Sequence, residues 1–155
     1  MSGFKDKILL ITGGTGSFGN AVLRRFLDSD IKEIRIFSRD EKKQDDMRHH
    51  LQNPKVKFYI GNVRDRQSVD GAMVGVDYVF SAAALKQVPS CEFFPLQAVQ
   101  TNVIGYGQCA GISHSAWGEK RSSAFYRQGG LPHQCHGYQQ SHDGEGCHSQ
   151  GPCVG

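Results

Sequence analysis

The sequence contains no apolar run long enough to cross a membrane and no run of like charges that would mark a nucleic-acid-binding arm. Its first residues lead directly into a short strand-like segment and do not resemble a secretory signal. The formal net charge is +3 over 155 residues, which is too small to indicate a nucleic-acid partner. These absences favour a cytoplasmic protein that binds neither nucleic acid nor a membrane.

The last third of the chain lacks the residues that build a core. Residues 106–155 contain only three large aliphatic side chains, at Ile112, Leu131 and Val154. The same segment holds four of the five cysteines and five of the seven histidines. Three aliphatic side chains cannot bury a useful core. We therefore expect a globular unit over residues 1–105 and a non-native or disordered tail over residues 106–155.

Residues 1–105 show the hydrophobic pattern of an α/β fold. Short apolar runs predict buried strands at residues 7–12, 33–37, 56–60 and 76–81. Helical spacing predicts helices between them and after them, at residues 19–27, 40–51, 66–73 and 95–104, with Asp40 and Asp65 as N-caps. Alternating strands and helices predict a truncated Rossmann-type fold, with a doubly wound parallel sheet.

A glycine-rich turn follows the first predicted strand. Gly13, Gly16 and Gly19 form the pattern G-x-x-G-x-x-G between that strand and the next helix. Glycines allow a tight turn and a close approach of the backbone to a pyrophosphate, which the N-terminus of the helix attracts. The order of strand, turn and helix predicts dinucleotide binding. The alternative is a turn that only packs strand on helix; the phosphate-loop pattern G-x-x-x-x-G-K-[ST] is absent.

The end of the second predicted strand bears on the choice between NAD and NADP. An acidic residue there would accept the ribose hydroxyls, whereas this chain has Ser38-Arg39-Asp40. Arg39 can pair with a 2′-phosphate and Ser38 can donate a hydrogen bond to it. With Asp40 interpreted as the helix cap, the segment favours NADP over NAD. Alternatively, Arg39 is an ordinary solvated charge.

Further candidates lie at the ends of the third and fourth predicted strands. Gly61, Asn62 and Val63 lie where adenine would rest. The small residues after the fourth strand either allow close approach of the nicotinamide-side ribose or are ordinary small-residue packing. Lys86 is a possible substrate-side contact, or a surface lysine. We assign no catalytic residue. The predicted cofactor-binding residues are Gly13, Thr15, Gly16, Ser17, Phe18, Gly19, Ser38, Arg39, Asn62, Val63, Ala82, Ala83, Ala84 and Asn102.

Four stretches resemble the extended short-chain dehydrogenase/reductase superfamily of sugar-nucleotide enzymes, namely residues 7–20, 36–44, 82–89 and 101–105. The narrower resemblance is to the inverting UDP-N-acetylglucosamine 4,6-dehydratase (5-epimerase) family of capsule and O-antigen biosynthesis. It implies a UDP-sugar substrate, oxidation at sugar C4, loss of water across C5 and C6, and reduction at C6. It also implies a homo-oligomer for the full-length form. The family has Asp where Asn62 stands, which would at most weaken cofactor binding.

The catalytic Thr-Asp-Lys and Tyr-x-x-x-Lys or Met-x-x-x-Lys segments of that family do not occur in this chain. Codons for the tail nevertheless permit them when read one base later. Residues 126–128 then permit Thr-Asp-Lys, residues 131–134 permit Tyr-Pro-Ile-Asn, and residues 136–140 permit Met-Gly-Ile-Ser-Lys. We therefore predict a frameshift at or just after Gly105, and a translated chain without dehydratase activity.

Two other functions remain open from the sequence. The first is a non-catalytic NADP-binding fragment, which needs only the glycine turn, Arg39 and the small residues. The second is a small metal-binding interaction protein, suggested by His133, Cys135, His136, Cys147, His148 and Cys153. No C-x-x-C pair or zinc-finger spacing supports a metal site. We therefore predict no metal.

Overall fold

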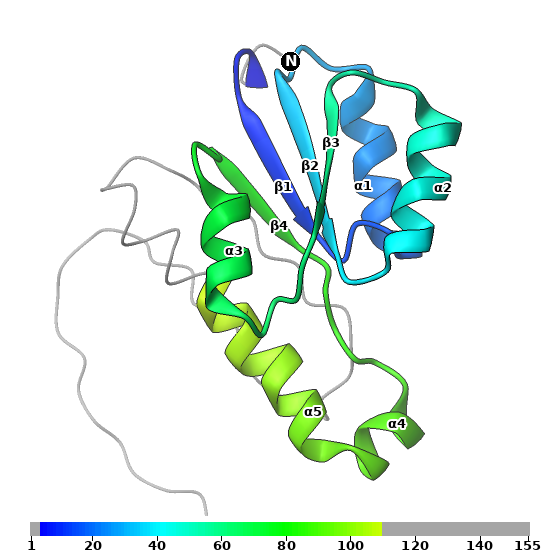
Figure 1. The fold of residues 1–155 in the computed structure, drawn as a ribbon, viewed down its shortest axis with the longest axis vertical. Helices are drawn as coiled ribbons and strands as arrows, with labels where there is room; N and C mark the ends of the chain where they lie inside the picture. The colour runs from blue at the N-terminus through cyan, green and yellow to red at the C-terminus, as the bar shows by residue number, and fades with distance from the viewer. Residues whose placement is uncertain (1–3, 110–155) are drawn as a thin grey trace, which may run out of the picture.

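The computed structural model describes residues 4–109, which form a parallel sheet flanked by helices (Figure 1). The strand order is β3-β2-β1-β4, and each neighbouring pair is parallel. This arrangement confirms the predicted α/β fold. The strands are β1 (Ile8–Thr12), β2 (Glu33–Ser38), β3 (Val56–Ile60) and β4 (Tyr78–Ser81).

The helices cover both faces of the sheet, as Figure 1 shows. Leu23 of the first helix and Ile11 of β1 belong to one apolar cluster, whereas Val69 of the third helix and Leu10 of β1 belong to another. Successive residues of a strand point to opposite faces, which explains the two clusters. The helices are α1 (Ser17–Leu27), α2 (Glu41–Leu51), α3 (Arg66–Met73), α4 (Val88–Phe93), α5 (Pro95–Val99) and the π-helix η2 (Gln100–Gly105).

Both predicted N-caps are present. The Asp40 carboxylate accepts a hydrogen bond from the Lys43 backbone N–H at 3.0 Å, and Asp65 accepts one from the Gln67 N–H at 3.1 Å. A hydrogen bond to a carboxylate favours its charged form. The bond from the Lys43 N–H lowers the pKa of Asp40, and the bond from the Ser68 hydroxyl lowers that of Asp65.

Several strand and helix boundaries differ from the prediction by one or two residues, and the last helix extends further. β4 begins at Tyr78 rather than residue 76, because the Val76 N–H donates to the Met73 carbonyl in the turn after α3. The helix predicted over residues 95–104 is α5 followed by η2, and residues 106–109 continue it. The short helix α4 was not predicted.

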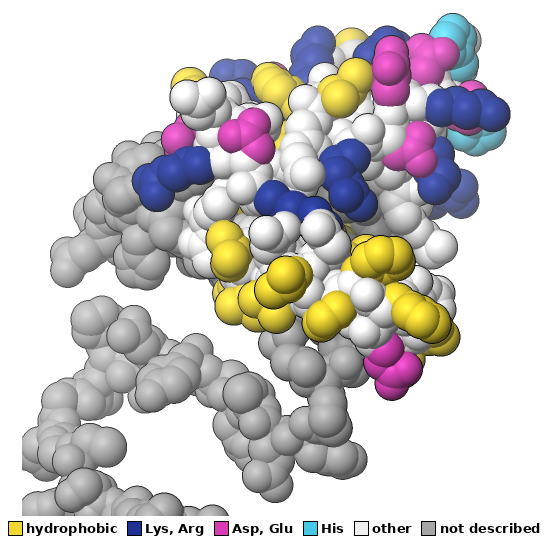
Figure 2. Space-filling view, turned by 60° about the horizontal axis from the view of Figure 1, so that its bottom comes forward, with side chains coloured by type: hydrophobic (Ala, Val, Ile, Leu, Met, Phe, Trp, Pro, Cys, Tyr) yellow, Lys and Arg dark blue, Asp and Glu magenta, His cyan; other side chains and the backbone are white. Residues whose placement is uncertain are grey.

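Apolar side chains gather on the surface of α4, α5 and η2 (Figure 2). The exposed large apolar residues there are Val88, Phe93, Phe94, Leu96, Val99, Val103, Ile104 and Tyr106. No helix among residues 4–109 is long and apolar enough to cross a membrane. Of the tail predicted over residues 106–155, residues 106–109 are helical and Cys109 is buried in the core, contrary to the prediction for these four residues. The rest of the tail, with its histidines and its other cysteines, lies outside the described residues.

Candidate functional site

A pocket of about 540 Å³ lies at the carboxyl ends of the strands. Ligands of open α/β sheets bind at this edge, where the chain order changes direction, here between β1 and β4. All of the predicted cofactor-binding residues except Asn102 line the pocket, and so does Lys86. Gly61, which was predicted to lie beside adenine, lines it too. Residues that were not predicted also line it: Phe37, Asp40, Lys43, Leu85 and Thr101.

The glycine turn forms the floor of the pocket because three backbone segments meet there. Gly13 has a φ of +65°, and a Cβ atom on it would lie 2.8 Å from the backbone of Ala83. A Cβ atom on Gly19 would lie 2.5 Å from Gly14 Cα. Only glycine fits such positions without strain. The absence of a side chain at Gly13 therefore leaves room for the loop after β4, and its absence at Gly19 lets the glycine turn pack against α1.

The N-terminus of α1 opens onto the same floor. Among the described residues, no side chain caps this helix at Gly16. The first N–H groups of a helix have no intrahelical partner and carry the positive end of its dipole. Because Gly16 and Ser17 line the pocket, an anionic group there would meet this helix end. The turn therefore fits the pyrophosphate of a dinucleotide.

The end of β2 is fixed to its neighbours by polar side chains. The Ser38 and Thr15 hydroxyl oxygens lie 2.8 Å apart, and the Asp40 N–H donates to Ser38 Oγ at 3.3 Å. The Gln44 side chain, only 1% exposed, donates from Nε2 to the backbone carbonyls of Ser38 and Tyr59. Sequence reasoning missed Gln44, a polar residue on an otherwise polar helix. These contacts place the Ser38–Asp40 turn at the pocket.

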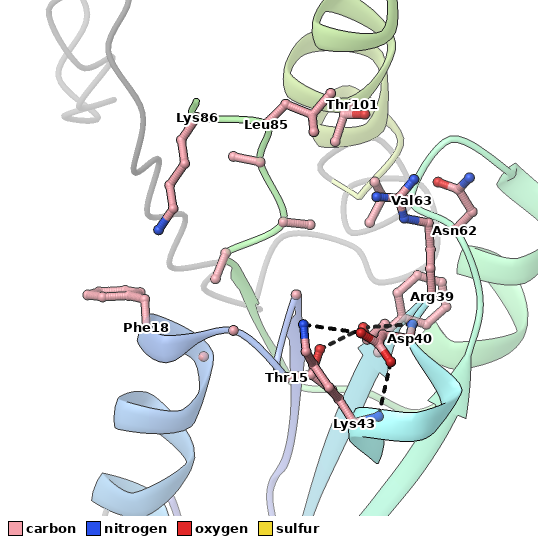
Figure 3. Close-up of a pocket in the computed structure, with 18 of the residues that line it drawn as sticks. Thr15, Phe18, Arg39, Asp40, Lys43, Asn62, Val63, Leu85, Lys86 and Thr101 are labelled. Carbon is pink, nitrogen blue, oxygen red and sulfur yellow. Dashed lines mark hydrogen bonds and ion pairs between the residues drawn. The ribbon is translucent and has the colours of Figure 1, made fainter. Parts of the chain in front are cut away.

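Two cationic side chains flank this turn. Arg39 is exposed, and its long side chain extends from the end of β2 along the pocket in the close-up (Figure 3). Lys43 lies in the first turn of α2, and its Nζ is 3.2 Å from an Asp40 oxygen. The Asp40 carboxylate is therefore engaged with α2, as its interpretation as a cap requires. The four-residue spacing between Arg39 and Lys43 was a signal that the sequence analysis did not use.

The segment after β3 forms the wall on the far side of β2. The Asn62 side-chain oxygen accepts a hydrogen bond from the Arg64 N–H at 3.1 Å. An amide oxygen has two lone pairs, so one acceptor position remains for the predicted contact with adenine. A Cβ atom on Gly61 would lie 2.6 Å from the Phe37 ring, which explains the glycine beside Asn62.

The loop after β4 forms the opposite wall. The Ala82 N–H donates to the Thr12 carbonyl at 3.0 Å, and the Ala83 N–H donates to the Thr12 hydroxyl at 3.4 Å. These bonds hold the small residues against the end of β1. Lys86 and Phe18 stand at the mouth of the pocket near this wall (Figure 3). The Phe18 ring stacks on Phe80, with 5.6 Å between ring centroids.

Asn102 is the one predicted cofactor residue that does not line the pocket. Its side-chain amide instead makes two hydrogen bonds of 2.8 Å with the backbone of Leu85. The preceding residue, Thr101, does line the pocket. Within residues 4–109, no group of three or more His, Cys, Asp or Glu side chains is placed to hold a metal ion.

Comparison with known proteins agrees with this architecture. Residues 9–120 match the family model described as polysaccharide biosynthesis protein. The UDP-glucose 4-epimerase of Rickettsia canadensis is 73% identical over 106 residues, and that of Rickettsia bellii strain RML369-C is 72% identical. Each match covers 66% of this chain and 31% of the relative. The chain therefore spans about a third of the length of these curated relatives.

Solved structures show the same fold. Pen from Bacillus thuringiensis is 38% identical with a TM-score of 0.69, covering 72% of this chain and 34% of that one. The Bordetella bronchiseptica enzyme WbmF in complex with NAD+ has a TM-score of 0.61 at 19% identity, over 73% of this chain and 34% of that one. At that identity the likeness to WbmF supports the fold alone.

Proposed function

Because the chain belongs to the polysaccharide biosynthesis protein family, we propose that residues 4–109 are part of the cofactor-binding domain of a sugar-nucleotide dehydratase or epimerase. The pocket carries this proposal. It runs from Arg39 and Asn62, across the glycine turn, to Ala82–Lys86. An adenine, a pyrophosphate and a nicotinamide ribose would meet these three regions in that order.

The proposed cofactor is NADP. Arg39 and Lys43 place two positive charges beside the end of β2, and Asp40, the only carboxylate among the described residues that line the pocket, already accepts bonds from Lys43. A 2′-phosphate gains from charge-assisted hydrogen bonds with such cations. NAD would leave both cations without that partner. NAD is therefore the less favoured cofactor, although WbmF was solved with NAD+.

The proposed reaction is that of a UDP-N-acetylglucosamine 4,6-dehydratase, because the narrower motifs at residues 36–44 and 82–89 resemble that family. A UDP-glucose 4-epimerase is the second candidate, since the relatives with 72–73% identity carry that name. In either reaction the bound cofactor supplies a hydride acceptor and donor for the sugar. Described residues of this chain hold and orient the cofactor, and Lys86 lies on the substrate side.

We propose that the chain as translated does not complete the reaction. The chain lacks the Thr-Asp-Lys and Met-x-x-x-Lys segments, which the codons of residues 126–140 permit when read one base later. On this view residues 106–155 are a frameshift product, and the translated chain is a non-catalytic NADP-binding fragment. A cytoplasmic location, a UDP-sugar partner and oligomerisation of the full-length form belong to the same proposal.

Activity of two matched chains tests the proposal. One is the 155-residue chain, and the other is the full-length form that is encoded when the reading frame is restored just after Gly105. Each is incubated with UDP-N-acetylglucosamine or UDP-glucose, and the products are identified by NMR. We expect a 4-keto-6-deoxy sugar from UDP-N-acetylglucosamine with the restored chain only. Epimerisation of UDP-glucose alone would favour the second candidate, and turnover by the unrestored chain would contradict the inactivity.

A further inference from the structure

The amide of Asn102 joins the π-helix η2 to the loop after β4. Its oxygen accepts from the Leu85 N–H, and its Nδ2 donates to the Leu85 carbonyl, both at 2.8 Å. One side chain thereby bonds both backbone groups of a residue that lies in neither a helix nor a strand, and the Leu85 carbonyl also accepts a weaker hydrogen bond from Cys91 Sγ at 3.6 Å. Buried or half-buried backbone groups need such partners, so the position of Leu85 depends on this contact.

The helix that carries Asn102 is itself fixed. Arg64, after β3, donates from Nε to the Thr101 hydroxyl at 2.8 Å and from a guanidinium nitrogen to the Gln97 carbonyl. Thr101 is buried and Gly105 is packed against Val63. Short π-helical segments occur frequently at functional sites. Here the segment directs Thr101 to the pocket and Asn102 to Leu85.

The loop held by Asn102 forms one end of the pocket. β4 and β2 lie on opposite sides of β1, so the Ala82–Lys86 loop and the Ser38–Asp40 turn are at opposite ends of the cleft. With the adenosine 2′-phosphate at the turn and the pyrophosphate at the glycines, the nicotinamide half must reach the loop. Leu85 itself lines the pocket.

We propose that Asn102 is a positioning residue that sets the Ala82–Lys86 loop against the nicotinamide half of the dinucleotide. It acts through the Leu85 backbone and does not contact the cofactor. The inference rests on the proposed function, because it requires a dinucleotide in the pocket. It differs from the sequence prediction, which placed Asn102 among the cofactor contacts.

Two ligands of different length distinguish the contributions of the two ends of the pocket to binding. Isothermal titration of the full chain with NADP+ reports on both ends, whereas 2′,5′-ADP reports on the β2 end and the glycine turn. For Asn102→Ala we expect the Kd for NADP+ to rise about tenfold and the Kd for 2′,5′-ADP to stay within about twofold. Asn53→Ala is the matched control, because the Asn53 side chain also bonds a backbone N–H but does not line the pocket. We expect it to change neither Kd.

A second variant tests the hydrogen-bond geometry. In Asn102→Asp the carboxylate retains an acceptor for the Leu85 N–H but has no donor for the Leu85 carbonyl. We expect the ratio of the NADP+ and 2′,5′-ADP Kd values to match that of Asn102→Ala at pH 8, where the carboxyl is ionised.

Four results would overturn the inference. Equal loss of both ligands in Asn102→Ala means that the side chain supports the whole fold, and no loss of NADP+ affinity means that it does not position the loop. If the unaltered chain binds NADP+ no more tightly than 2′,5′-ADP, the Ala82–Lys86 loop makes no contact with the nicotinamide half. Failure of the unaltered chain to bind 2′,5′-ADP contradicts the proposed function, and the inference with it.

Discussion

The hydroxyl oxygens of Thr15 and Ser38 lie 2.8 Å apart, and this contact joins the glycine turn after β1 to the end of β2. The two segments are 23 residues apart in the sequence. Their hydrogen bond fixes the turn that meets a pyrophosphate relative to the turn that meets the adenosine ribose. The spacing between the two binding regions is thus set within the protein before any cofactor binds.

The cations beside Ser38 should determine which dinucleotide binds. We expect Arg39→Ala and Lys43→Ala each to weaken NADPH binding by about tenfold to a hundredfold, because each removes a charged partner of the 2′-phosphate. NADH binding should change little. Lys42→Ala is the control, since it removes the same charge from a neighbouring exposed position that does not line the pocket. Fluorescence titration gives the Kd values of the three variants for NADPH and NADH. An equal loss of NADPH affinity in Lys42→Ala would show that the preference comes from the general positive charge of the surface and not from contacts in the pocket.

The close approach at Gly13 should make that position intolerant of any side chain. Gly13→Ala combines a positive φ with a Cβ atom 2.8 Å from the Ala83 backbone. We expect the free energy of unfolding, measured in urea, to fall by ~1–3 kcal/mol. The matched control is Gly71→Ala within α3, where a Cβ atom would meet nothing within 4 Å. That change should raise the free energy of unfolding by up to ~1 kcal/mol. Similar losses of stability in both variants would contradict the close packing of Gly13 against the loop after β4.

Asp40 should contribute a pH-dependent part of the stability of α2. Hydrogen bonds and the ion pair with Lys43 lower the pKa of this carboxyl below its usual 3.8. The stabilisation is therefore complete above pH 3.8 and is lost as pH falls through the lower pKa of the folded state. The stability difference between the unaltered chain and Asp40→Ala should be present at pH 7 and shrink below pH 4. Asp46→Ala, an exposed change on the same helix, should show little difference at either pH.

Cys109 should resist alkylation while the fold is intact. Burial disfavours the charged thiolate and raises the pKa of this thiol from 9.0 to about 11. The Cys109 side chain is part of the apolar cluster that includes Val69 of α3. Only the thiolate reacts with iodoacetamide. At pH 8 peptide mass spectrometry should find Cys109 unmodified in the native chain and modified after urea is added. Rapid native modification would show that the end of the helix does not pack on the sheet.

The sequence was sufficient for features that depend on local pattern. The four apolar runs became four parallel strands, and Asp40 and Asp65 became helix caps, because hydrophobic spacing and capping act over a few residues. The glycine turn could also be placed, since strand, turn and helix follow one another directly. These local patterns were enough to predict most of the residues that line the pocket.

Residues whose roles depend on distant partners were harder to find. Gln44 bonds the carbonyls of two different strands, and Asn102 bonds a loop 17 residues earlier. Neither partner can be read from a neighbouring position. Lys43 reaches the pocket because α2 begins at Glu41, directly after the Asp40 cap at the end of β2. The helix α4 was missed because its six residues are too few for a periodic pattern.

The relative affinity of the unaltered chain for NADPH and NADH tests the central claim most directly. Both are titrated at the same low ionic strength by nicotinamide fluorescence, with Kd as the measured quantity. We predict that NADPH binds at least about tenfold more tightly than NADH, as a charged contact to the 2′-phosphate requires. Equal or tighter binding of NADH would contradict the assignment of Arg39 and Lys43, and no binding of either at millimolar concentration would contradict the cofactor site itself.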